Sequence, residues 1–390
     1  MQLAHYPDTP RAMRLFPSHA LQRLVLRHAL ACSALGLDIA AVRGEDDSAV
    51  SRWLAERAGV LPAALSDDLE RIDELTSDRG ASALIASGAR TGVDVCGLGL
   101  DPLEVAVRTF LDHGDVFEAA HCRLVVAALR GTTEFAGRGA IAARIPSLAG
   151  MQALEAQMGQ YFEARARSPH CRVATGRDGD RLVFTIARGA LVRADEALEG
   201  GPMVVRDSAI PVYMTERTLR YRPQRRDVVV YDSASGQLRI RSGDAASVHA
   251  YRRAFGHLLH GDGEWFGNDQ VVSLEPLVRL GRAIEEPTPG LAQVRVVGLI
   301  VRYPQGDKGT VAIDSDDIWP FLQNRMRSTI ADGELLEASF RIFRPGIAEG
   351  TLVRARIPNI VKYGKLDDTV FRPYLEARGI LAGATGRVDA

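Results

Sequence analysis

The sequence predicts an α+β protein, in which a helical N-terminal region is followed by antiparallel sheet regions. Apolar residues recur at helical spacing before residue 168, whereas short runs of alternating apolar and polar residues dominate after residue 170. After residue 291, the order strand, strand, helix occurs twice, which is typical of a tandem repeat. A chain of 390 residues has room for two or three domains. We expect a helical domain at 1–168, a mixed hairpin and helix domain at 169–287, and a ββα-ββα domain at 291–390.

The helical region contains three well-marked helix starts. An amphipathic stripe over residues 15–32 predicts the first helix. Residues 101–104 combine an N-cap carboxylate, a proline at the first helical position and a glutamate three residues after the cap, and a similar pattern recurs at Asp115. Together these signals predict a helical hairpin over 102–130. Ser147 then caps a helix that ends before Pro169.

The middle of the chain contains two predicted hairpins. Residues 171–189 flank an Arg-Asp-Gly-Asp turn, and residues 228–241 flank a turn that ends in glycine. The segment 194–224 is rich in glycine and proline, so we expect an irregular excursion with one strand at most. A helix is expected over 245–259.

A linker rich in proline and acidic residues, 285–290, precedes the predicted repeat. Each repeat unit reads as two strands and a helix, with the helices near 316–326 and 369–378. If both helices cover one face of a shared four-stranded sheet, the other face is free. We therefore predict that functional side chains lie on that free face.

Composition excludes several classes of protein. The hydrophobic fraction is 46% and the formal net charge is −1, so the chain is neither disordered nor basic throughout. No stretch approaches the ~18–20 apolar residues that span a bilayer, and the first residues lack the apolar run of a secretory signal. We expect a cytoplasmic protein with no membrane contact. Only three of the 48 basic residues are lysine, which is typical of a GC-rich bacterial genome.

Sequence motifs leave open whether the chain is an enzyme. It contains no P-loop, no Gly-x-Ser-x-Gly elbow and no His-Glu-x-x-His helix. The four cysteines are dispersed without zinc-ribbon spacing, so we expect neither a metal site nor a cofactor.

The densest group of acid–base side chains lies in residues 257–269. His257 and His260 are three residues apart at a predicted helix end, and Asp262 and Glu264 follow in a glycine-rich loop. Imidazole and carboxylate groups at this spacing could bind a metal ion, which gives the hypothesis of a metal-dependent hydrolase or nuclease. The alternative is that the histidines complement the helix dipole and the acidic residues are solvated.

Arginines alternate with apolar residues in the predicted strands. Arg239 and Arg241 share one side of their strand, as Arg354 and Arg356 do in theirs. Residues 217–253 contain nine arginines, including Arg225 and Arg226, against three aspartates. Such clusters are typical of phosphate binding. The alternative is that solvent-facing positions are arginine because this sequence uses arginine in place of lysine.

The leading hypothesis is therefore a non-catalytic binding or accessory protein. Its arginine-rich sheet surface would contact nucleic acid or an acidic protein partner. The hydrolase centred on residues 257–269 is one alternative, and a scaffold that docks another protein through helices 102–130 is a third hypothesis. The sequence does not specify the oligomeric state, the cellular pathway, or whether a nucleic-acid partner is DNA or RNA.

Overall fold

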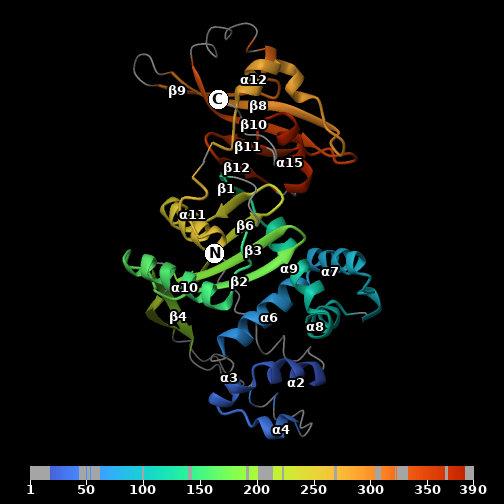
Figure 1. Cartoon of the computed structure of the whole chain (residues 1–390), viewed down its shortest axis with the longest axis vertical. Helices are drawn as coiled ribbons and strands as arrows, with labels where there is room; N and C mark the ends of the chain where they lie inside the picture. Colours follow the sequence, from blue (N-terminus) through green and yellow to red (C-terminus); the bar gives the residue numbers. More distant parts are fainter. Residues whose placement is uncertain are drawn as a thin grey trace. The chain divides into compact units, whose positions relative to one another are not determined.

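The computed structural model shows two compact units (Figure 1). The first comprises Met1–Ala128 with Gly176–Gly179, and the second comprises Leu129–Thr175 with Asp180–Ala390. The structure describes residues 18–43, 50, 53, 62–98, 101–138, 143–189, 193–200, 214–221, 224–267, 270–303, 309–320, 322, 333–364 and 368–382. Within these ranges no helix has both the length and the apolar character needed to cross a membrane.

The first unit is helical. Its elements are α2 (Ser18–Arg27), α3 (Ala29–Ala34), α4 (Ile39–Arg43), α6 (Ala63–Leu75), α7 (Asp78–Thr91), η1 (Cys96–Leu98), α8 (Pro102–Asp112) and α9 (Gly114–Ala127). The predicted cap of α8 is confirmed, because the Asp101 side chain accepts a hydrogen bond from the backbone N–H of Leu103 at 2.8 Å. Apolar stripes of α8 and α9 lie buried in a core shared with α2 and α6. The apolar residues of helices 102–130 thus pack inside the first unit.

The second unit is built on one ten-stranded antiparallel sheet, with strand order β2-β3-β6-β7-β1-β12-β11-β10-β8-β9 (Figure 1). The strands are β1 (Gly131–Ala136), β2 (Cys171–Asp178), β3 (Arg181–Gly189), β6 (Gln224–Asp232), β7 (Gln237–Arg241), β8 (Gln293–Arg302), β9 (Thr310–Asp314), β10 (Glu334–Phe343), β11 (Thr351–Arg356) and β12 (Ile360–Tyr363). A separate two-stranded sheet pairs β4 (Arg193–Gly200) with β5 (Met214–Tyr221). β1 joins two halves of the large sheet, since it pairs with both β7 and β12.

Helices cover opposite faces of the two halves. α10 (Leu148–Glu163) and α11 (Ala245–His260) pack on the β3, β6 and β7 half, where Phe184 and Phe255 meet edge to face at 4.8 Å. α15 (Asp368–Ala377) packs on the other half, where Phe371 lies 4.7 Å from Tyr363 of β12. α12 (Glu275–Leu280) and η2 (Gly281–Glu285) lie beside α15, because the Tyr374 hydroxyl donates to the Ile284 carbonyl at 2.5 Å.

The register shows that these are different faces. Thr132 and Glu134 of β1 share a face with Val361 of β12, and that face meets α15. Phe135 points to the opposite side and belongs to the core under α10 and α11. Each half of the sheet therefore has one face covered by its own helices, and the face opposite α15 on β8 to β12 carries none of the described helices.

The α+β class predicted from the sequence is confirmed, and so are both predicted hairpins around residues 180 and 235. The predicted irregular segment 194–224 instead contributes β4 and β5, and β1 was not predicted. The ββα repeat is not confirmed: the second predicted unit contains three strands, β10, β11 and β12, before α15, and residues 321 and 323–326 of the first predicted helix lie outside the described residues. Strands on both sides of the boundary predicted near residue 288 join the same sheet. The predicted order of elements thus holds better than the predicted grouping of elements.

Candidate functional site

The arginines predicted to form one surface lie on opposite faces of the sheet. Arg239 is the cross-strand partner of Glu134 and faces α15, as does Arg241 two residues later. Arg354 pairs with Lys362, and these residues alternate with Ala355 and Val361, which face α15. Arg354 and Arg356 therefore point away from α15, so the prediction of a single four-arginine surface is wrong.

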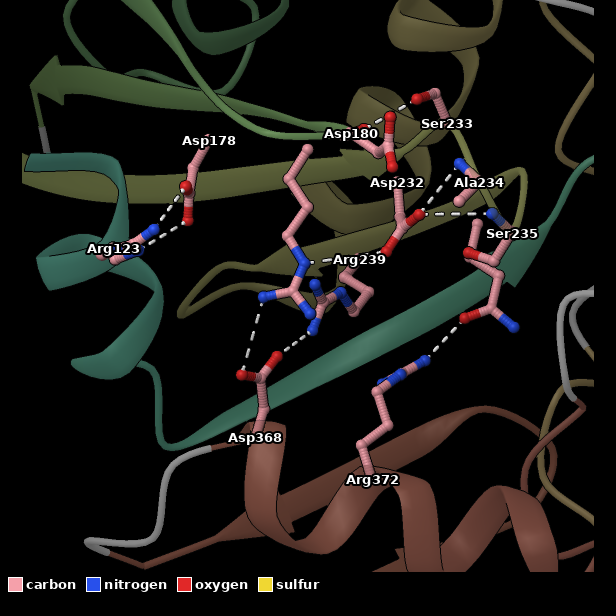
Figure 2. Close-up of polar contacts among 12 residues, drawn as sticks. Arg123, Asp178, Asp180, Asp232, Ser233, Ala234, Ser235, Arg239, Asp368 and Arg372 are labelled. Carbon is pink, nitrogen blue, oxygen red and sulfur yellow. Dashed lines mark hydrogen bonds and ion pairs between the residues drawn. The ribbon is translucent and has the colours of Figure 1, made fainter. Parts of the chain in front are cut away.

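Arg239 belongs to a buried ion network and not to a binding surface. Its side chain is 2% exposed and is bonded to Asp368, the first residue of α15 (Figure 2). Arg181 also approaches Asp368, at 3.8 Å. The cause of this burial is that α15 packs across the junction of the two sheet halves, where a charge needs a partner.

The same network holds α15 to β1. Arg372, labelled in Figure 2, donates to both oxygens of Glu134, at 3.0 and 2.7 Å, and to the Gln237 side-chain oxygen at 2.6 Å. Burial, the largest single influence, opposes ionisation of Glu134, which is 1% exposed. The charge and hydrogen bonds of Arg372, together with the Arg239 charge and the Thr132 hydroxyl, outweigh burial and hold the pKa of Glu134 below its ordinary value. Glu376, a further partner of Arg372, has a pKa raised by burial. The bidentate contact between Arg372 and Glu134 is typical of an ion pair that holds two elements together.

The remaining predicted arginines are exposed but lie elsewhere. Arg225 and Arg226 are neighbours near the start of β6, and Arg241 ends β7 opposite Val228. Arg225 pairs across to Arg188 of β3, at the opposite end of the large sheet from β8 and β9. The structure therefore does not bring Arg225, Arg226 and Arg241 together with Arg354 and Arg356.

Four exposed cations gather on the sheet face opposite α15, and we call this group the basic face. Arg354 and Lys362 are direct cross-strand partners, and Arg356 follows Arg354 by two residues on β11. Arg295 of β8 is the fourth. Val353, Ala355 and Val361, which alternate with these cations, are fully buried against the α15 side. Burial of the alternate residues fixes the orientation of the cations toward solvent.

The basic face lacks compensating anions among the residues that the structure describes. No carboxylate lies within ion-pair distance of its four cations in those ranges, whereas Arg341, beside Arg295, pairs with Asp316 at 2.7 Å. Glu337 is the cross-strand partner of Arg356, yet the two side chains form no ion pair, and Glu337 is 9% exposed. The Arg295 guanidinium lies 5.8 Å from the centre of the Phe343 ring. The face is thus a local excess of positive charge in a chain of net charge −1.

The acidic residues of the predicted hydrolase site are engaged by arginines. Asp262 pairs with Arg138 at 3.0 Å, and Glu264 pairs with Arg252 at 3.1 Å and Arg253 at 2.9 Å. Asn268 and Asp269 lie outside the described residues. Carboxylates neutralised in this way are poorly placed to bind a cation.

The two histidines of that segment also diverge. His257 is exposed, while His260 stacks on Trp265 with ring centres 4.3 Å apart and lies 5.6 Å from Tyr231. Burial, and then the charge of Arg144, lower the pKa of His260. Within the described ranges no three His, Cys, Asp or Glu side chains gather closely enough to hold a metal ion. The four side chains do not converge as the hydrolase hypothesis requires.

A pocket of about 270 Å³ lies beside α12, the start of β10 and the residues Ile357 and Pro358. Its lining is mostly apolar, with Gln270, Ser273 and Glu275 as its polar side chains. A pocket that binds an anionic substrate needs a cation, and this lining includes none.

Comparisons with known proteins assign no family. No family model matches the chain, and no curated protein matches it significantly. The geometry of the described residues is therefore the basis for a functional proposal.

Sequence reasoning missed two members of the basic face, Arg295 and Lys362. The signal was present, because both alternate with apolar residues in the segments Gln-Val-Arg-Val-Val and Ile-Val-Lys-Tyr. It also missed that Glu134 and Arg372, 238 residues apart, form the anchor of α15. No local pattern signals a pairing over that separation.

Proposed function

We propose that the second unit binds the phosphate backbone of a nucleic acid through the basic face. The supporting observation is that Arg354, Arg356 and Lys362 lie side by side on a sheet surface that none of the described helices covers, with no carboxylate partner among the described residues. Guanidinium and ammonium groups are the side chains that proteins use to bind phosphate.

The energetics of the sheet support a bound anion. Arg354 and Lys362 are direct partners on neighbouring strands, and like charges in this position destabilise a sheet. Several exposed arginines elsewhere in the chain have a carboxylate partner, as Arg23 has Asp112 at 2.6 Å. The adjacent cations of the basic face have none among the described residues, and an external anion would neutralise them.

The spacing of the cations favours a ligand with repeating charge. Arg354 and Arg356 are two residues apart on one strand, hence about 6.6 Å apart along it, and Lys362 is displaced by about one strand spacing of 4.8 Å. Successive phosphates of a nucleic acid strand present negative charges at a similar separation. A single carboxylate could neutralise only part of such a group.

The direct test replaces Arg354, Arg356 and Lys362 together by alanine. We expect weaker binding of a single-stranded oligonucleotide in fluorescence anisotropy, with a slope of log affinity against log salt reduced by about 2, since each lost contact removes about 0.7. The melting temperature should change little, because exposed cations contribute little to folding.

The control is a triple variant that removes three exposed arginines already paired with carboxylates, Arg23, Arg90 and Arg282. It lowers the net charge by the same amount, so it should retain most of the affinity and of the salt slope. Equal losses in both variants would overturn the proposal. Absence of oligonucleotide binding at about 50 mM salt would also overturn it and would favour an acidic protein partner.

A further inference from the structure

We infer that the basic face recognises phosphates without bases, so that a base-free polyphosphate chain binds the same site as a nucleic acid. This inference rests on the proposed function and narrows its ligand class. The basis is the chemistry of the side chains that surround the four cations.

Proteins that grip single-stranded bases place exposed aromatic rings among their cations, and the basic face has none in the described ranges. Tyr363, between Lys362 and Gly364, points to the opposite face and packs on Phe371. Phe340 is fully buried on the α15 side. Phe343 lies on the same face as Arg295 but is half-buried, with its ring centre 5.8 Å from the Arg295 guanidinium. Bases that stack gain most of their affinity from exposed rings. The basic face therefore offers no fully exposed ring on which a base can stack.

The neutral side chains of this face are also unsuited to reading base edges. Leu352 and Ile360, beside the cations on β11 and β12, are aliphatic and half-buried. Ser339, the partner of Arg354 on β10, is 9% exposed. Reading of adenine and cytosine generally uses exposed amide or carboxylate groups. Charge and hydrogen-bond donors are what this surface presents.

Acidic side chains limit the extent of the site. Asp314 lies across Gly298 at the β9 edge of the same face, with its Oδ1 2.6 Å from where a β-carbon of that glycine would stand. Asp316 neutralises Arg341. A polyanion is repelled from this edge, so contacts concentrate on the four cations of β8, β11 and β12. We expect about four phosphate contacts and a salt slope near 3 for a flexible chain.

The experiment is a competition assay with the full chain. A labelled thymidine oligonucleotide is bound to the protein and then displaced by unlabelled competitors. The competitors are an adenosine oligonucleotide, a guanosine-containing oligonucleotide and an abasic oligonucleotide, all of the same length, and inorganic polyphosphate. We expect all competitors, compared at equal phosphate number, to agree within about threefold, since stacking would separate them by about tenfold or more. Guanosine is included because arginine can bind the edge of guanine.

Three outcomes overturn the inference. Polyphosphate or abasic competitors that fail where base-containing strands succeed would show that bases are read, while leaving the proposed function intact. Affinities that differ by more than about tenfold between oligonucleotides of different base composition would also show that bases are read. Polyphosphate binding that survives replacement of Arg354, Arg356 and Lys362 by alanine would place the phosphate site elsewhere. If no oligonucleotide binds at all, the proposed function itself fails.

Discussion

At the scale of single residues, Glu134 and Arg372 form a buried ion pair that anchors α15 to β1. Replacing Glu134 with Gln should lower the free energy of unfolding by about 3 kcal/mol, because the Arg372 charge would stay buried with a weakened partner. Urea denaturation measures this effect. The matched control is Glu334→Gln, which alters the exposed pair with Arg302 and should cost at most about 1 kcal/mol.

The pH dependence of this pair has a definite sign. The folded-state pKa of Glu134 is lowered, so the unfolded chain binds its proton more readily, at an ordinary pKa of about 4.3. The stabilisation is therefore fully present above about pH 4.3 and is lost as the pH falls through the lower folded-state pKa. The Glu134→Gln variant should lack this contribution to acid sensitivity. Equal acid sensitivity in both proteins would contradict the assignment.

The residues that sequence analysis selected illustrate a general limit. Arg239 and Arg354 occur in similar alternating patterns, yet one is buried against Asp368 and the other is exposed. Alternation assigns neighbouring residues to opposite sides of a strand, but it does not say which side a helix covers. That depends on where α15 packs, which is a tertiary property.

At the scale of secondary-structure elements, local capping chemistry determines where α8 begins. Asp101→Ala should destabilise the first unit by about 1 kcal/mol, because it removes the acceptor for the Leu103 N–H. Thermal or urea unfolding measures the change. Asp101→Asn is the control, since asparagine caps equally well and should restore stability. An alanine variant as stable as the asparagine variant would show that the cap contributes nothing.

Secondary-structure elements that begin at a helix cap or border a turn glycine were predicted from the sequence. Elements that lack such local signals were not predicted. The caps Asp101 and Ser147 fix the starts of α8 and α10, and the turn glycines Gly179 and Gly236 adopt the positive φ values, 62° and 66°, that favour glycine. β1 was missed because Gly-Thr-Thr-Glu-Phe-Ala follows directly on a helix and includes a buried glutamate. Its strand character depends on β7 and β12, which lie far away in the sequence.

At the scale of the second unit as a whole, the two sheet halves have a similar order of elements. The first half contains α10, four strands and α11, and the second contains α12, strands β8 to β12 and α15. β7 and β12 run in the same direction, because each pairs antiparallel with β1. The covering helices lie on opposite faces, so the second half presents the basic face where the first is covered. Sequence patterns predicted Arg354 and Arg356 of this face but missed Arg295 and Lys362, and they wrongly grouped Arg239 and Arg241 with it.

The scarcity of lysine allows a direct test of whether nucleic acid binds at the basic face. The chain has three lysines, Lys308, Lys362 and Lys365, and Lys362 belongs to the basic face. The protein is acetylated with an amine-specific reagent, once with a saturating oligonucleotide and once without it. The extent of acetylation of each lysine is measured by mass spectrometry, and that of Lys308 is the internal reference. We predict that bound oligonucleotide slows acetylation of Lys362 relative to Lys308. Unchanged Lys362 reactivity, under conditions where anisotropy shows saturated binding, would contradict the account.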